Sequence, residues 1–264
     1  YTMNGGSLKT SHMLVGYNAR GVNGTGADVR FTQNGGMVGV GTIDAANVGG
    51  GIYLAGGGNQ SDGTVQGNCP FVVAEYLLND GTLTCGGWGN SVNLAFCSPI
   101  DANGGITPAA AYTQNGGTAS VHWLTFGSKT STVGVNDGYG LLDLAGGTFA
   151  LGAAAGDPLV NFKSTWNNDA AKSNSVYSVR LHGGSLKLLN GSTWPLAAHF
   201  PKGGTTTLGE NNGTSVFQAP ISGAGTIVKK GTGTLMLTDA TRFGGSLDVF
   251  AGTVKRAPEA FRKL

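Results

Sequence analysis

The residues that could carry out acid–base chemistry are few and lie far apart in this sequence. Only 14 of its 264 residues are Asp or Glu, and the closest groupings are Asp28 with Arg30 and Asp137 near Asp143. Polysaccharide-cleaving enzymes need two carboxylates, or a carboxylate with a base and an arginine, on one exposed face. Because an isolated Asp is also common in turns, we interpret these residues as turn residues. The sequence predicts no catalytic residue and favours a non-catalytic protein.

Metal and cofactor sites are not predicted either. Glycine-rich runs such as residues 21–26 are expected by chance in a chain with 48 glycines, and none opens a helix as a nucleotide-binding loop does. The histidines fit no metal-ligand spacing, and we expect them on strands or at the surface. They are His12, His122, His182 and His199.

The three cysteines lie close together in the sequence but match no zinc or redox motif. They are Cys69, Cys85 and Cys97. One disulfide with one free thiol would suit an extracellular protein, and three buried thiols fit the sequence equally well. Both alternatives stay open.

Tryptophan offers a flat face on which a sugar ring can stack. Of the four tryptophans, Trp166 lies in a polar segment, residues 163–172, and is the candidate for glycan stacking. Packing in the core or in a loop is the simpler expectation for all four. The other three are Trp88, Trp123 and Trp194.

The composition argues against several classes of protein. Sixteen basic and 14 acidic residues give a formal net charge of +2, so no general attraction to nucleic acid is expected. Hydrophobic residues make up 40 % of the chain and charged residues 11 %, which argues against disorder. No apolar run approaches the roughly 18 residues that a transmembrane segment needs. Basic pairs such as Lys229-Lys230 are expected at solvated strand ends.

Internal repetition is the strongest feature of the sequence. One phrase consists of an aromatic residue, Thr, a variable residue, Asn and two glycines, and it occurs at residues 1–6, 31–36 and 112–117. A second phrase consists of Gly, Thr or Ser, and two apolar residues separated by one position. This alternation is typical of a strand, since successive side chains point to opposite faces. The copies begin at Gly81, Gly147, Gly184, Gly233 and Gly245.

The alternation assigns an inside and an outside to each strand. In the last copy it predicts that Leu247 and Val249 point inward and Asp248 outward. In the copy that begins at Gly184 it predicts an outward Lys187. Glycine density argues against a helix, because each interior glycine costs about 1 kcal/mol relative to alanine.

The spacing of the turns predicts the architecture. Glycine turns recur about every 20 residues in the C-terminal third, whereas a hairpin protein shows turns every 8–12 residues. A 20-residue unit with two or three short strands fits one coil of a parallel β-helix, and a β-sandwich is the alternative. We predict one β-helix domain, residues 1–254, of about 10–12 coils, with residues 255–264 as a tail or cap. Wider spacing earlier in the chain predicts insertions near residues 59–75, 98–111 and 153–178.

Residues 221–254 resemble the autotransporter-associated β-strand repeat. The matching features are Ile227 to Lys230, then Gly231 to Leu237, then Phe243-Gly244-Gly245 and Gly252-Thr253-Val254. Thr241-Arg242 stands where the family usually has Asn-Thr. The resemblance implies a right-handed, passenger-type β-helix exported to the cell surface, but it implies no particular activity.

The sequence therefore predicts an all-β, right-handed parallel β-helix that acts as an extracellular structural or adhesive module. Open ends of such a solenoid expose unpaired strands, so end-to-end self-association into fibres is one expectation. A surface glycan or protein is another expected partner. The alternative function is a carbohydrate-binding or polysaccharide-cleaving β-helix, which predicts a groove with two carboxylates beside Trp or Tyr. A scaffold predicts Thr, Ser and Asn on the outer faces instead.

Overall fold

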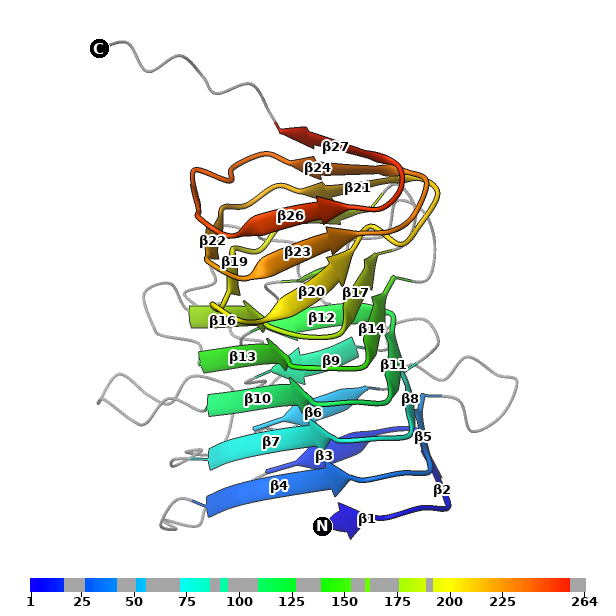
Figure 1. Cartoon of the computed structure of the whole chain (residues 1–264). Coiled ribbons are helices and arrows are strands. Elements are labelled where there is room, and N and C mark those ends of the chain that lie inside the picture. The colour runs from blue at the N-terminus through cyan, green and yellow to red at the C-terminus, as the bar shows by residue number, and fades with distance from the viewer. Residues whose placement is uncertain are drawn as a thin grey trace, which may run out of the picture.

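Apart from the strand at Val160–Asn161 and the three strands of the last coil, each described strand pairs with the strand three places further along the chain, and every pairing is parallel. Three strands therefore make one coil, and the next coil lies directly on it (Figure 1). The computed structural model describes residues 1–16, 27–41, 51–55, 72–85, 91–94, 109–126, 139–152, 160–161, 176–188 and 192–256.

Two nine-stranded sheets run the full length of the stack, and two shorter sheets share its third side. Sheet A contains β1 (Thr2–Met3), β4 (Ala27–Gln33), β7 (Val72–Leu78), β10 (Ala109–Gln114), β13 (Tyr139–Leu144), β16 (Val176–Leu181), β19 (Ala198–Phe200), β22 (Ile221–Gly223) and β25 (Arg242–Phe243). Sheet B contains β2 (Ser7–Thr10), β5 (Met37–Val40), β8 (Thr82–Cys85), β11 (Thr118–Val121), β14 (Thr148–Leu151), β17 (Ser185–Leu188), β20 (Thr205–Leu208), β23 (Thr226–Lys229) and β26 (Ser246–Val249). Sheet C contains β3 (Met13–Val15), β6 (Ile52–Leu54), β9 (Ser91–Leu94), β12 (Trp123–Phe126) and β15 (Val160–Asn161). Sheet D contains β18 (Thr193–Trp194), β21 (Thr214–Phe217), β24 (Thr234–Leu237) and β27 (Thr253–Arg256).

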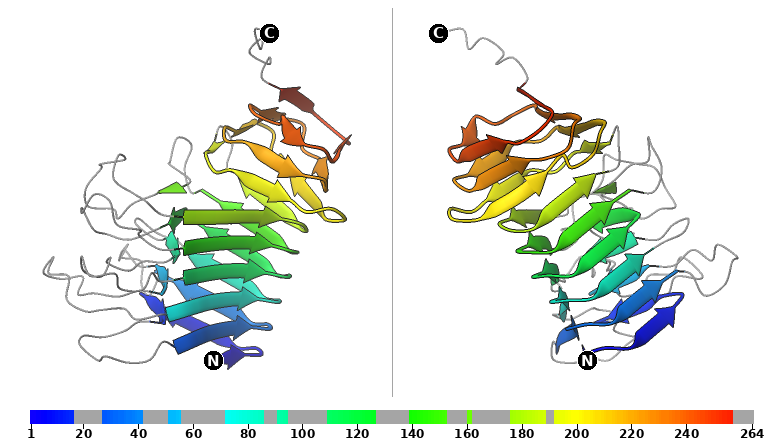
Figure 2. Two further views of the ribbon diagram at one scale, coloured as in Figure 1. Left: turned by 90° about the vertical axis from the view of Figure 1, so that its left-hand side faces the viewer. Right: turned by 45° about the vertical axis from the view of Figure 1, so that its right-hand side comes forward.

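The predicted all-β, right-handed parallel β-helix is confirmed. In Figure 1 sheet A runs from left to right at the front and sheet C returns behind it as the chain rises, which makes the coil right-handed. Figure 2 shows the same stack from two other sides. The described strands form nine coils: coil 1 is β1, β2 and β3, and coil 9 is β25, β26 and β27. The predicted 10–12 coils exceed the nine that the described strands form, because the long connections take up residues that a regular 20-residue spacing would assign to further coils.

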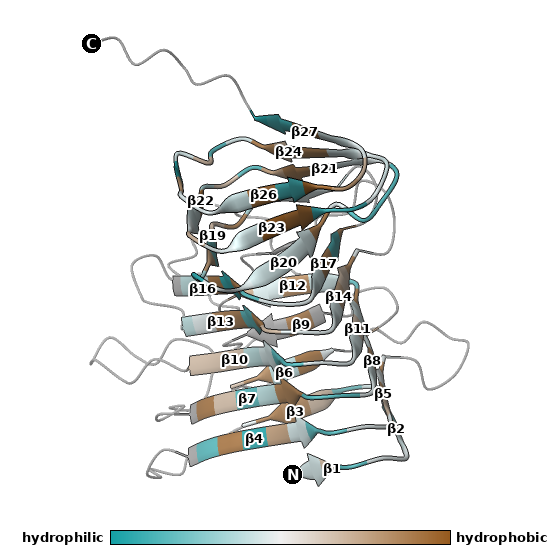
Figure 3. Ribbon diagram, viewed as in Figure 1, coloured by the Kyte–Doolittle hydropathy of each residue, from teal (hydrophilic) through white to brown (hydrophobic). Residues whose placement is uncertain are grey.

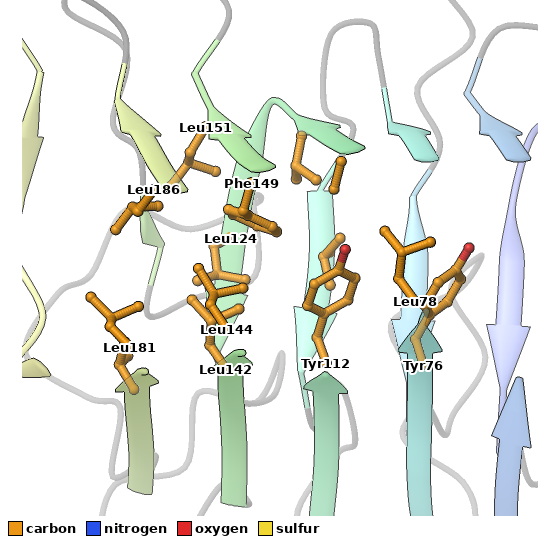
Figure 4. Close-up of a cluster of buried hydrophobic side chains, with 14 of the residues drawn as sticks. Tyr76, Leu78, Tyr112, Leu124, Leu142, Leu144, Phe149, Leu151, Leu181 and Leu186 are labelled. Atoms are coloured by element: carbon orange, nitrogen blue, oxygen red, sulfur yellow. The ribbon is translucent and has the colours of Figure 1, made fainter. Parts of the chain in front are cut away.

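Alternating burial along the strands produces the core. In β10 and β13 every second residue is buried, as the period of two requires. The same alternation is visible as hydrophobic and hydrophilic bands along β4 in Figure 3. The buried side chains of successive coils lie over one another in columns, which Figure 4 shows for Tyr76, Tyr112 and Leu142.

The repeated phrase at residues 112–117 forms the corner between sheets A and B. Tyr112 lies in the core column, and the buried Gln114 donates hydrogen bonds to the carbonyls of Gly117 (3.3 Å) and Thr148 (3.0 Å). The Tyr112 hydroxyl donates to Gln114 Oε1 at 3.1 Å, so the buried amide is satisfied on both sides. Asn115 lies outside, and its side chain bonds that of the corresponding asparagine in the preceding coil.

Two features restrict the corner position of this phrase to glycine. Gly117 has a φ of 65°, a conformation that L side chains rarely adopt. A Cβ at this position would also lie 2.6 Å from the carbonyl oxygen of Gly81, which is in the coil below. The glycines therefore mark the corners of the coil.

Long connections are restricted to the first six coils. Five segments outside the described residues each join the third strand of one coil to sheet A of the next: 17–26, 56–71, 95–108, 127–138 and 162–175. In coils 7 to 9 the same connection is short, as between Phe217 and Ile221. This difference explains why the regular 20-residue spacing is visible only in the C-terminal third.

The predicted insertions overlap strands at their boundaries. Residues 72–75 belong to β7 and residues 109–111 to β10. Residues 160–161 form β15, and residues 176–178 begin β16. At the C-terminus β27 continues to Arg256, so the first two residues of the predicted tail or cap belong to a strand. Residues 257–264 lie outside the described residues.

Two burial expectations were wrong. Val249 is 49 % exposed rather than inside, because coil 9 has no further described coil above it. Lys229, expected in solvent, is completely buried, and its ammonium group donates to the backbone carbonyls of Gly231 and Ala251. Burial lowers the pKa of Lys229. Its ammonium group therefore binds turn carbonyls in the C-terminal coils, as the Gln114 amide does in the N-terminal ones.

Candidate functional site

The outer face of sheet A carries the group that comes closest to a chemical site. Asp143 in β13 accepts a hydrogen bond or ion pair from His182 Nε2 at 2.7 Å and from Arg180 Nη1 at 3.3 Å. Asp143 and Arg180 are directly paired in the register of the sheet, and His182 follows at the corner. The carboxylate is only 14 % exposed, whereas the imidazole is 31 % exposed. The arrangement orients the His182 ring from one side.

A nucleophile or second carboxylate is needed to turn this pair into a catalytic group. The nearest hydroxyl in register is that of Thr113, and it donates to Glu75 instead, at 2.9 Å. The other nitrogen of His182 has no hydrogen-bond partner among the residues that the structure describes. The geometry supports an ion pair between coils 5 and 6 and not a catalytic triad.

A second charged set joins coils 2, 3 and 4 on the same face. Arg30 Nε bonds Glu75 Oε2 at 2.5 Å, and these two residues are also directly paired in the sheet. The interpretation of Asp28 and Arg30 as turn residues was wrong, since both lie in β4, and the partner of Arg30 is 45 residues further along the chain. The Glu75 carboxylate thus pairs with the Arg30 guanidinium of the coil below and accepts a hydrogen bond from the Thr113 hydroxyl of the coil above.

Sheet B has a comparable bridge between coils 6 and 7. Glu210 accepts bonds from Lys187 Nζ and Ser185 Oγ, both at 2.9 Å. Burial alone would raise the pKa of Glu210, but these two hydrogen bonds and the charges of Lys187 and Lys230 lower it below its ordinary value. Lys187 is exposed, as the strand alternation predicted.

Uncharged polar side chains form ladders along the same outer faces. Asn4, Asn34, Asn79 and Asn115 are joined in sequence by side-chain hydrogen bonds of 2.8 Å each. On sheet B the outward positions in register carry mainly hydroxyls. These residues are Thr82, Thr118, Thr148, Ser185 and Thr207.

Of the residues singled out in the sequence for a disulfide or for glycan stacking, the structure describes only Cys85. Cys85 is buried between Val40 and Val121, and burial raises its pKa to about 12. Cys69, Cys97 and Trp166 lie outside the described residues. In the part of the chain that the structure covers, no three His, Cys, Asp or Glu side chains form a group able to bind a metal.

Two tryptophans are described, and neither is well exposed. Trp194 is completely buried in coil 6, and Trp123 in β12 is partly buried beside His122. Trp88 lies outside the described residues. The described part of the chain also contains no helix long and apolar enough to cross a membrane.

Sequence reasoning missed the ion pairs, although the repeats contain the signal for them. Residues 142–147 and 179–184 are equivalent phrases in consecutive coils, and aligning them places Asp143 opposite Arg180. The pair Arg30 and Glu75 follows in the same way from aligning the equivalent segments of coils 2 and 3. Only the alignment of coils, and not proximity in the sequence, identifies these partners.

Comparison of the chain with protein-family models, curated proteins and solved structures found no match. The resemblance of residues 221–254 to the autotransporter-associated β-strand repeat therefore stays a prediction. In the structure this segment forms β22, β23 and β24 of coil 8 and most of coil 9.

Proposed function

We propose that this chain is a structural β-solenoid module of a secreted or surface-displayed bacterial protein. One observation supports this proposal most directly. The outward polar side chains bond to each other between coils, as in the set Arg30, Glu75 and Thr113, instead of converging on one exposed site. Such cross-strand pairs stabilise a sheet and leave few free groups for a ligand.

In the proposed module the long connections all occur at the same step of the coil. The five long connections named above all leave the coil where the third strand ends and sheet A begins. Loops on a rigid scaffold are the usual carriers of binding function. We therefore assign adhesion to these segments and mechanical support to the coils.

Exchange of a connection tests this division of roles. Replacement of residues 127–138 by a glycine–serine linker of equal length is expected to leave the β-sheet circular dichroism spectrum unchanged and to shift Tm by no more than a few degrees. The reason is that the described strands of coils 4 and 5 keep all their ladder bonds. Leu142→Asp, which buries a charge in the same region, is the positive control and should unfold the protein. Unfolding of the linker variant would show that the coils are not stable without the native connection.

A carbohydrate-binding or carbohydrate-cleaving protein is the second candidate, and the pair of Asp143 and the partly exposed His182 on the outer face of sheet A is the observation in its favour. A glycan array and a reducing-sugar assay separate the two functions. The scaffold proposal expects that any glycan bound is unaffected by Asp143→Asn or His182→Ala, and that no reducing sugar is released. Binding or cleavage that both substitutions abolish, in variants with unchanged circular dichroism, would favour the carbohydrate-active protein.

A further inference from the structure

Sheet C differs from the other long sheets in the chemistry of its outer face. The ion pairs described above involve residues on or next to sheets A and B, whereas the described strands of sheet C contain no Asp, Glu, Lys or Arg. In β12 the side chains of Leu124 and Phe126 belong to the core, so the alternation places Trp123 and Thr125 on the outer face. A ligand on this face would therefore meet polar and aromatic groups but no charge.

Thr125 is buried although it points away from the core. It is 1 % exposed, whereas Thr118 and Ser120, the outward residues of β11 in the same coil, are exposed. Thr125 Oγ1 and Trp123 Nε1 are both buried atoms, and neither has a hydrogen-bond partner among the residues that the structure describes. Buried polar groups are nearly always paired, so two unpaired groups on one strand face point to a missing partner.

The spacing of the two unpaired groups suits a molecule with several hydroxyls. Trp123 and Thr125 are two positions apart on one strand, which separates their Cα atoms by about 6.6 Å. The indole N–H can only donate a hydrogen bond, whereas the threonine hydroxyl can donate and accept. A sugar ring carries hydroxyls on opposite sides, and each hydroxyl both donates and accepts, so a single sugar could satisfy both groups.

Aromatic rings flank these hydrogen-bonding groups. The Trp123 ring is partly buried against His122, with ring centroids 4.7 Å apart, and this contact orients the indole. Tyr53 lies on the same outer face two coils below, about 10 Å along the axis, and its ring stacks on His12 at 6.0 Å. Flat rings beside a few hydrogen-bonding groups are typical of a site for a sugar.

We propose that the outer face of sheet C in coil 4 binds a neutral oligosaccharide. Trp123 Nε1–H donates to a sugar oxygen, and the Thr125 hydroxyl bonds a sugar hydroxyl. The absence of charge on the described strands of sheet C favours a neutral sugar over an acidic one. The site adjoins the connection of residues 127–138, which follows β12 directly, so this inference rests on the adhesive role proposed above and names its ligand. Described coils lie both below and above the site.

Removal of single atoms tests this site. An array of neutral and uronic-acid-containing oligosaccharides, probed with the 264-residue chain, should show binding to neutral members. For the neutral oligosaccharide that binds most tightly, Thr125→Val and Trp123→Phe should each raise the Kd measured by calorimetry about tenfold, equivalent to about 1.4 kcal/mol. Without sugar, the Tm of Thr125→Val should equal or exceed that of the wild type, because the hydroxyl has no protein partner to lose. Weaker binding at undiminished stability separates a ligand contact from a structural role.

The matched controls are Thr206→Val and Trp194→Phe. They delete the same kinds of polar group, which are also buried and unpaired among the described residues but lie inside the core of coils 7 and 6. Both should leave the Kd unchanged. Circular dichroism of each variant establishes that it is folded.

Three results would each overturn the site. They are no binding to any neutral oligosaccharide, a Kd that both site substitutions leave unchanged, and a lower Tm of Thr125→Val without sugar. Binding that ignores both substitutions would reject this site and keep the adhesive role. The scaffold function is tested separately by the linker exchange.

Discussion

Gly117→Ala is expected to destabilise the protein by about 3 kcal/mol or more, although it adds only one methyl group. The left-handed backbone conformation at a φ of 65° costs a non-glycine residue roughly 1–2 kcal/mol. The new Cβ would also lie 2.6 Å from the Gly81 carbonyl oxygen, and overpacking against backbone adds about 1–3 kcal/mol. For a chain of this size we expect Tm to fall by about 6–12 °C, measured by circular dichroism.

Gly6→Ala provides a control that separates the two causes. Gly6 occupies the same corner in coil 1 with a φ of 81°, but a Cβ there would meet no atom within 4 Å because no described coil lies below it. Only the conformational cost remains, so a loss of about 1–2 kcal/mol is expected. Equal losses for the two variants would contradict the view that tight stacking of consecutive corners requires the glycine.

Gln114→Leu is expected to cost about 2–3 kcal/mol even though leucine has a similar size and is apolar. The substitution leaves the buried Tyr112 hydroxyl without its acceptor, and an unsatisfied buried group costs about 1–3 kcal/mol. It also removes the amide donors to Gly117 and Thr148. The Gly117 carbonyl still accepts the Thr148 N–H at 2.9 Å, so most of the loss should come from the hydroxyl. Chemical denaturation gives the free energy of unfolding.

A double-mutant cycle with Tyr112→Phe tests this assignment. The double variant has neither the amide nor the hydroxyl, and coil 5 shows that an apolar pair, Leu142 with Leu144, is accepted at the equivalent positions. We expect the double variant to be more stable than Gln114→Leu alone by about 1 kcal/mol. Additive losses in the cycle would mean that the two side chains do not act as a unit.

The sequence allowed the coil architecture to be predicted because its signals are local. Alternation of apolar residues identifies a strand, and corner glycines at regular spacing identify the turn of a coil. The phrase at residues 112–117 combines both signals, and each of its positions has a structural role. Leu186, Leu188 and Lys187 have the burial that alternation predicted.

The burial of individual residues and the ion pairs could not be predicted, because they depend on the coils above and below each residue. Lys229 and Lys230 are neighbouring residues of the same type, yet only Lys229 occupies an inward position. There its ammonium group donates hydrogen bonds to backbone carbonyls of the turns. Val249 follows the inward pattern but lacks a covering coil. The partners Arg30 and Glu75 are separated by a connection whose length no local rule specifies. Such contacts require the register between coils, which only alignment of the repeats or a structure supplies.

The replacement of sheet C by sheet D has a mechanical consequence. Sheets A and B continue through all nine coils, but among the described strands β15 and β18 do not pair, so two hydrogen-bonded sides and not three connect coils 5 and 6. The pairing is shorter still between coils 6 and 7, where β16 and β19 are paired at one residue and the strands of the other two sheets at two residues each. Coil 6 is therefore the region in which a rod stretched along its axis would yield first, and the two parts on either side would separate as intact blocks.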